Sequence, residues 1–156
     1  MRSLYVLLFM VSLQMVASQE LNYELLFEVE AQLKTPIEIG KLPMGERTIF
    51  PFDKGTFKGP KMKGTIGASG ADWSLKINET TSILDIRGLY TLDSGEHIYV
   101  QAKGYLHFNQ DGTYYLRSTP IFETTAKGFE WLNHIVSVGV GELSKTGVKF
   151  RIYAIK

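Results

Sequence analysis

The segment LNYELLFEVEAQL, residues 21–33, decides the fold class of this chain. Apolar and polar side chains alternate along it with period two, which is the pattern of a β-strand that buries one face and exposes the other. The same alternation returns in residues 98–107 and in residues 148–154. These segments predict a sheet protein whose strands each turn one face toward a shared core.

Turn-forming residues separate the alternating segments, and both Asp93-Ser94-Gly95 and Asp111-Gly112 have the composition of hairpin loops. With no helices to cover a sheet face, the strands must close on themselves or pack as two sheets. The prediction is all-β: a single antiparallel β-barrel of about 8–10 strands, in one domain over residues 19–156. Its predicted strands are residues 21–33, 46–50, 56–67, 71–78, 83–92, 96–108, 113–123, 134–143 and 148–155, with a short helical turn over 128–132.

The N-terminal residues have the pattern of a secretory signal. Arg2 provides a positive start, residues 4–16 form an apolar run, and Val16-Ala17-Ser18 ends in small residues. About 13 apolar residues are too few for a membrane anchor, which needs roughly 20. We therefore expect residues 1–18 to be a signal peptide cleaved before Gln19. The protein would then be secreted or reach the lumen of the secretory pathway, with no membrane span.

A glycosylation signal agrees with that route. Asn78-Glu79-Thr80 is an acceptor sequence for N-linked glycans in a secreted eukaryotic protein. It lies in a polar stretch, residues 78–82, whose composition indicates a turn where a glycan would be tolerated. Asn78 is therefore the predicted site of modification.

Composition excludes several classes of function. The chain holds 17 Lys and Arg against 16 Asp and Glu, and loss of Arg2 with the signal peptide would bring the formal net charge to zero. A neutral protein lacks the basic surface that nucleic-acid binding needs. Without cysteines there are no disulfides, no thiol catalysis and no thiolate metal sites. His97, His107 and His134 lack ligand spacing, and no nucleotide motif is present, so we expect neither metal nor cofactor.

Four blocks place polar side chains or an indole inside predicted strands: residues 70–75, 84–87, 116–120 and 131–133. Such groups are costly to bury unless they are paired, so they either face water or line a cavity with polar spots. Asp85 and Arg87 share one face of their strand. They form either a solvent-facing pair on the outer wall or an inward pair that could orient a carbonyl or hydroxyl group.

Three further polar features remain open in the same way. Alternation favours Trp73 on the apolar face, as a core residue rather than a stacking platform, with Asp72 on the opposite face. Arg117 shares a mixed face with Glu123, as a structural ion pair or as an acid–base pair. Gly139 and Gly141 share a strand face, which leaves room for a ligand or for another side chain to approach the backbone.

Several blocks together match the pattern of one known family: residues 25–29, 55–60, 70–73, the Tyr90 strand, 98–100, 117–124, 131–133 and 138–142. On these blocks the chain resembles, over residues 21 to 155, the domain-of-unknown-function 3237 family, the UPF0311 proteins. The resemblance implies a single compact β-barrel and little about activity, because the family is largely uncharacterised. The family is mostly bacterial and cytosolic, so the signal peptide and the glycosylation sequence are departures that suggest a eukaryotic member. The barrel is similar in outline to allene oxide cyclase and dirigent proteins, which steer cyclisations without a cofactor; this is an analogy of fold.

Three hypotheses of function follow. The first is a cofactor-free cyclase, isomerase or lyase in secondary metabolism, acting on a small apolar or aromatic metabolite. Asp72 or Asp85 would move a proton, and Arg87 and Arg117 would polarise an oxygen. The second is a non-catalytic carrier of a small hydrophobic ligand, and the third is a fully packed structural or interaction protein. The predicted ligand-binding residues are Trp73, Tyr99, Phe122, Trp131 and Asn133, and an apolar outer wall could seat a homodimer.

Overall fold

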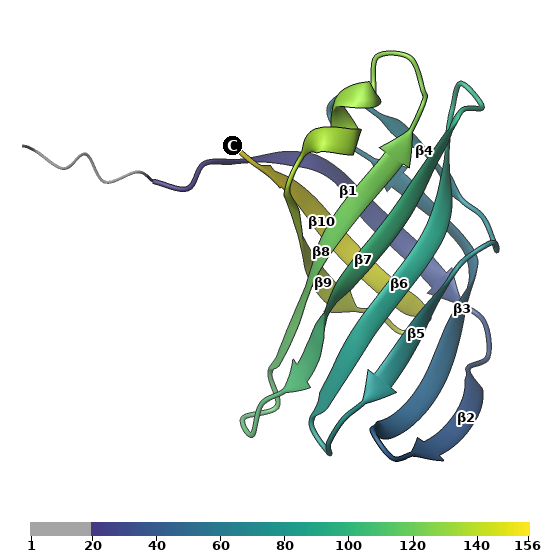
Figure 1. Cartoon of the computed structure of the whole chain (residues 1–156), viewed down its shortest axis with the longest axis vertical. Coiled ribbons are helices and arrows are strands. Elements are labelled where there is room, and N and C mark those ends of the chain that lie inside the picture. The colour runs from purple at the N-terminus through teal and green to yellow at the C-terminus, as the bar shows by residue number, and fades with distance from the viewer. Residues whose placement is uncertain (1–19) are drawn as a thin grey trace, which may run out of the picture.

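The structure, a computed structural model, describes residues 20–156, so the predicted signal peptide and its cleavage site lie outside the described residues. The described part contains ten β-strands and one short 3-10 helix, η1 (Glu130–His134) (Figure 1). The strands are β1 (Tyr23–Leu33), β2 (Ile37–Leu42), β3 (Gly45–Lys58), β4 (Lys63–Ile66), β5 (Ala71–Lys76), β6 (Thr81–Leu92), β7 (His97–Phe108), β8 (Tyr114–Thr124), β9 (Ser137–Leu143) and β10 (Gly147–Ile155).

The strands close into a barrel, and every pairing is antiparallel. Neighbours around the wall follow the order β1, β10, β9, β8, β7 and β6. Both β4 and β5 then fill the space between β6 and β3, one after the other along the same wall position. Pairing of β3 with β1, from Glu28–Lys58 to Leu33–Phe52, completes the ring. The predicted single antiparallel barrel is confirmed, with eight wall positions and β2 outside the ring.

Strand β3 runs unbroken through a stretch that the sequence pattern divided into 46–50 and 56–67. Pro51 lies inside this strand, although proline cannot donate a hydrogen bond to a sheet ladder. In the structure Pro51 falls where one edge of β3 changes partner, between the β2 pair at Ile49 and the β1 pair at Phe52. The missing N–H of Pro51 therefore removes no hydrogen bond from the pairing with β1 or β2. The strand ends instead at a turn in which Gly59 N–H donates to Met62 O at 2.7 Å.

Strand β2 was not predicted. It continues the line of β1 along β3 and pairs with β3 alone among the described strands. Its apolar side chains face water, with Ile37 51% and Ile39 55% exposed. The alternation Ile37-Glu38-Ile39 ends at Gly40, so it is shorter than the four to eight residues that indicate a strand.

The core is built around four buried rings at one end of the barrel. Phe27, 1% exposed, packs edge-on against Phe57, Tyr90 and Phe122, with ring centroids 5.5, 6.2 and 5.9 Å away. The alternation in β1 slips at Leu26, where the register shifts, so Leu26 and Phe27 are both buried.

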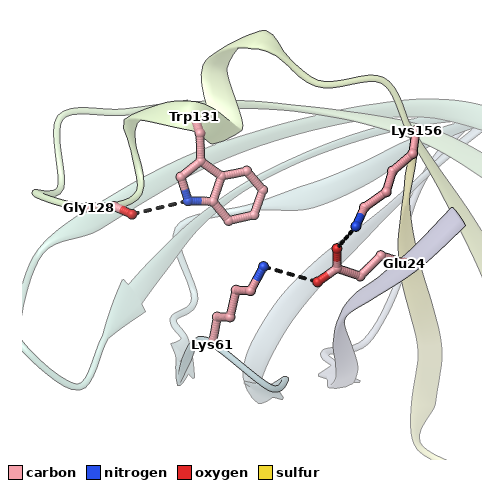
Figure 2. A network of polar contacts seen from close by, with 5 residues as sticks. All are labelled: Glu24, Lys61, Gly128, Trp131 and Lys156. Atoms are coloured by element: carbon pink, nitrogen blue, oxygen red, sulfur yellow. Dashed lines mark hydrogen bonds and ion pairs between the residues drawn. The ribbon is translucent and has the colours of Figure 1, made fainter.

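Helix η1 closes the same end of the barrel. Leu132 is 1% exposed, and Trp131 packs against the core while its indole N–H donates to Gly128 O at 3.1 Å. Figure 2 shows Glu24 of β1 bridging two lysines beside this helix. Lys61 lies 3.0 Å from the carboxylate, and Lys156 also contacts it. The hydrogen bonds from Lys156 and Lys61 hold the pKa of Glu24 below its ordinary value.

The predicted hairpin loops are present, and glycine is needed in both. Gly95 has φ 92° and Gly112 has φ 83°, which are left-handed conformations that other residues adopt only at a cost. Gly139 and Gly141 make room for side chains rather than for a ligand. A Cβ at Gly139 would overlap Ser118, and one at Gly141 would overlap Leu116. Among residues 20–156, the structure contains no helix with the length and apolarity to cross a bilayer.

We predict that Phe27→Ala lowers the free energy of unfolding by about 3–5 kcal/mol, because it leaves a cavity among three rings. Urea unfolding followed by tryptophan fluorescence measures the change. Tyr105→Ala is the matched control: this aromatic residue is 52% exposed on the outer wall, and its loss should cost less than about 1 kcal/mol. Equal losses in the two variants would contradict the assignment of Phe27 to the centre of the core.

Candidate functional site

The barrel encloses a cavity of about 200 Å³. A dry cavity of about 150 Å³ suffices to hold benzene, so this one has room for a small ring compound. The buried rings of Phe27, Tyr90 and Phe122 form one end of the cavity, beneath η1. Toward the opposite end the lining includes Leu143, which is 44% exposed, and Val148. That second end, the loop end, is where the cavity approaches solvent.

The lining is apolar except for a few groups. Asp72 is the sole charged side chain among the described residues that line the cavity; the other polar side chains are Ser74, Ser82, Ser118 and the Tyr90 hydroxyl. Ser74 and Ser118 are 7% and 4% exposed. Burial raises the pKa of Tyr90, so its phenol stays protonated and can donate a hydrogen bond.

Asp72 and Trp73 occupy the opposite faces from those that the alternation favoured. Asp72 and Ser74 line the cavity, so Trp73 between them projects from the outer wall. Trp73 is half-buried there, with the Arg87 guanidinium 5.9 Å from its ring. Polar residues lie on one face of β5 and apolar residues on the other. This alternation identifies a strand, but it does not determine which face turns toward the cavity.

The environment of Asp72 makes its carboxyl group a weak acid. Burial raises the pKa from 3.8 to about 6, and repulsion from Asp85 acts in the same direction. Two groups oppose this shift. The backbone N–H of Asp85 donates to Asp72 Oδ1 at 3.0 Å, and the positive charge of Arg47 favours the ionised form.

Asp85 and Arg87 lie on the outer wall, since Leu84 and Ile86 beside them line the cavity. Their side chains form a loose ion pair, with 3.5 Å between Arg87 Nη2 and Asp85 Oδ2. Both are partly exposed, 50% for Arg87 and 30% for Asp85. An exposed pair of this kind contributes little to stability.

Arg117 also faces outward, between Leu116 and Ser118 of the cavity lining. Its guanidinium lies 5.0 Å from the ring of Tyr115 and donates to Leu116 O at 2.8 Å. These contacts hold Arg117 on the wall surface, and they do not involve Glu123.

The five predicted ligand-binding residues are dispersed. Phe122 lines the cavity, whereas Tyr99 is on the outer wall between the buried Ile98 and Val100. Trp131 packs in η1, and Trp73 is outside. The side-chain amide of Asn133 binds the backbone of Thr124: it accepts a hydrogen bond from Thr124 N–H at 2.8 Å and donates one to Thr124 O at 2.9 Å. Of the predicted charged residues, the structure brings Asp72, Asp85 and Arg87 together at β5 and β6. Arg117 and Trp131 are held by other contacts.

Sequence reasoning missed three residues of the cavity region. Ser74 and Ser118 line it, and Arg47 of β3 donates to the carbonyl of Trp73. One available signal was Gly139, whose missing side chain faces Ser118 across β8 and β9. Arg47 carried no signal, because an arginine at the start of a strand is usually a surface residue.

The fold and the cavity together define a class of protein: a closed antiparallel β-barrel whose cavity, among the described residues, has a mainly apolar lining with one carboxyl group. The chain belongs to the family described as "Protein of unknown function (DUF3237)", whose model matches residues 21–155. The resemblance noted from the sequence is thereby confirmed.

Relatives and solved structures agree with this assignment. A UPF0311 protein of Clostridium acetobutylicum is 29% identical over 132 residues, covering 75% of this chain and 84% of the relative. A β-barrel-like protein from Acinetobacter baumannii has a TM-score of 0.85 at 31% identity, covering 90% of this chain and 99% of its own. An enzyme from Penicillium herquei has a TM-score of 0.72 at 18% identity, covering 87% and 95%, and this likeness shows the fold alone.

The raised pKa of Asp72 predicts a specific loss of stability with pH. Below about pH 4 the carboxyl is protonated in both states; between 3.8 and about 6 only the folded state keeps the proton, so stability falls as pH rises through this window. At about 1.4 kcal/mol for each pKa unit, the total is roughly 3 kcal/mol. Asp72→Asn should lack this fall.

Urea unfolding of the wild-type protein and of Asp72→Asn at pH 4 and pH 7.5 measures this change in stability. The contributions of the other titrating groups cancel when the two proteins are compared at the same pH. Asp53→Asn is the control, since Asp53 is exposed on β3 and its loss should leave the pH dependence unchanged. A wild-type protein and an Asp72→Asn variant that differ equally at both pH values would contradict the assigned environment of Asp72.

Proposed function

We propose that this protein is a cofactor-free acid–base enzyme of the cyclase, isomerase or lyase kind, in which Asp72 transfers a proton to or from a small apolar or aromatic molecule. The observation that carries the proposal is a single carboxyl group, with its pKa raised to about 6, on the wall of an apolar cavity. A titratable group in a pocket whose pKa is shifted by burial and by a charged neighbour is a candidate catalytic group.

The chemistry suits such a role. An acid whose pKa lies near the working pH is present in both protonation states, and general acid–base catalysis is most effective there. The N–H of Asp85 fixes Asp72 Oδ1, and Oδ2 accepts no hydrogen bond from the described residues. One oxygen is thus held by the wall while the other is available to a bound molecule.

The lining also restricts the substrate. A carboxylate in a cavity without a cationic lining residue among those described repels anions and attracts hydrogen-bond donors. The buried rings at the η1 end favour a flat, apolar partner. We therefore propose a neutral molecule of about one ring with a hydroxyl or an enolisable carbonyl group. The enzyme from Penicillium herquei supports a catalytic use of this fold.

One observation favours the alternative, a non-catalytic carrier. Arg87 and Arg117 both lie on the outer wall, so the charges that were expected to polarise a substrate oxygen do not face the cavity. Stabilisation of an oxyanion would depend on neutral donors such as the Tyr90 and Ser118 hydroxyl groups. A carrier needs only the apolar volume.

Secretion, glycosylation and dimer formation remain proposals about the setting of this function. Asn78 is exposed in the turn between β5 and β6, where its Oδ1 accepts from Thr80 N–H at 3.0 Å and from Thr80 Oγ1 at 3.2 Å. An exposed turn is accessible to the glycosylation machinery. On the outer wall, Tyr105 and Ile121 are each 52% exposed and could contact a second copy of the chain.

Proton transfer by Asp72 predicts hydrogen–deuterium exchange on a bound carbon acid. The wild-type protein, incubated in deuterium oxide near neutral pD with 3-methylcyclohex-2-enone, should accelerate deuterium incorporation. Asp72→Asn should lose about 10²–10⁴-fold of that acceleration, the usual contribution of a general base. Proton NMR of the ketone measures both rates, and shifts of cavity methyl resonances report binding.

Asp53→Asn is the control, because it removes an exposed carboxyl of β3 that does not line the cavity and keeps Asp72. If the ketone binds while wild type and Asp72→Asn exchange its protons at the same rate, the enzyme hypothesis fails and the carrier is favoured.

Expression through a eukaryotic secretory pathway should give protein in the medium that carries one glycan, at Asn78. Treatment with peptide N-glycosidase should increase its electrophoretic mobility, and Asn78→Gln should migrate like the treated protein. Asn109→Gln, in an exposed loop without an acceptor sequence, serves as control. Secreted wild-type protein whose mobility does not respond to the glycosidase would exclude the modification.

A further inference from the structure

The wall of the barrel is interrupted beside Asp72. Between β5 and β6, regular pairing holds at Ala71–Arg87 and Asp72–Ile86, and again at Leu75–Ile83 and Lys76–Ser82. Residues 73 and 74 lie opposite residues 85 and 84 without being paired to them. The interruption falls in the middle of two otherwise continuous strands, and we call it the β5–β6 gap.

Side chains take over the backbone groups at this gap. Asp85 N–H donates to the Asp72 carboxylate at 3.0 Å instead of to the facing strand, and the carbonyl of Trp73 accepts from the Arg47 guanidinium. Asp72 reaches the gap from the cavity. Arg47 reaches it from the outer wall, since it is three residues from the cavity-lining Phe50 and so on the opposite face of β3. The gap is therefore lined by polar groups from both sides of the wall.

One carboxylate oxygen of Asp85 also lies at the β5–β6 gap. Its Oδ1 is buried and accepts no hydrogen bond from the described residues, while Oδ2 faces Arg87 at 3.5 Å. A buried carboxylate oxygen without a partner is costly, and a bound water is its most frequent solution. The charged groups that face Asp72 are Arg47 of β3 together with Asp85 of β6, and Arg87 of β6 faces Asp85.

We propose that the β5–β6 gap is a proton port, in which a water molecule bound between Asp72 and Asp85 passes protons between the cavity and the outer surface. The proposal rests on the function proposed for Asp72. After Asp72 has taken a proton from a substrate, its O–H donates that proton to the water, and the water gives one of its own protons to the Asp85 carboxylate. Asp85, which is 30% exposed, releases it to solvent. Asp72 returns to the ionised form with no net change in the water.

Carbon-13 NMR of protein labelled in the aspartate carboxyl groups tests the port without any substrate. The Asp72 signal is identified by its loss in Asp72→Asn, and its line broadening near pH 6 gives the rate at which the carboxyl exchanges protons with solvent. Asp85→Asn keeps the backbone N–H and removes the relay, so the exchange should slow at least tenfold. Removal of a like charge should also lower the pKa of Asp72.

Two controls separate the routes. Glu123→Gln removes an exposed carboxylate of the outer wall on β8 and should change neither rate nor pKa. Leu143→Trp obstructs the loop end of the cavity and should leave the rate unchanged. Asp85→Ser, which also lacks a carboxylate, replaces Asp85→Asn if that variant does not fold.

An exchange rate in the Asp85 variant within twofold of wild type, or a rate that falls only in Leu143→Trp, would overturn the port. A wild-type Asp72 that titrates near 3.8 would instead overturn the proposed function itself. If Asp72 titrates near 6 and its proton-exchange rate is unchanged in Asp85→Asn, the proton port is refuted and the proposed function stands.

Discussion

Pairing between β1 and β3 is the contact on which the rest of the molecule depends. It joins the first wall strand to the strand that also carries β4 and β5, and it turns an open sheet into a ring. Without it two long strand edges would be free, and free edges invite association with other chains. The chain has no cysteine with which to hold the ring covalently. Closure therefore depends on hydrogen bonds and on the packing of Phe27 and Phe57 from the two strands.

Much of this architecture follows from sequence patterns, since period two, hairpin glycines and the lack of helical segments together specify an antiparallel barrel. The failures have local causes. At β2 the alternation ends after three residues, at Gly40. Strand β3 continues through Pro51 because the missing donor coincides with a change of partner strand. The hydrophobic effect favours an inward position for the large side chain of Trp73. The Arg87 side chain covers part of the Trp73 ring, so this residue can remain on the outer wall.

The candidate site was harder to predict than the fold for the same reason. Which face of β5 turns inward depends on its register with β3 and β6, and register is a property of three strands rather than of one. A shift by one residue would exchange Asp72 for Trp73 in the cavity. Asp72 itself was predicted as a site residue; its partners in the structure, Arg47 and the N–H of Asp85, come from strands that local patterns cannot bring together.

The first and last strands in the sequence, β1 and β10, are neighbours in the barrel wall. Lys156 N–H donates to Asn22 O at 2.8 Å, and β10 pairs with β1 along nearly its whole length, as Figure 1 shows near the C-terminus. A short peptide could therefore join residue 156 to residue 22, with new chain ends placed in the exposed loop at residues 109–112. In such a circular permutant the β1–β10 pair would become a local hairpin and the β7–β8 pair the most distant contact. The order in which the wall assembles during folding could then be changed without altering the barrel that results.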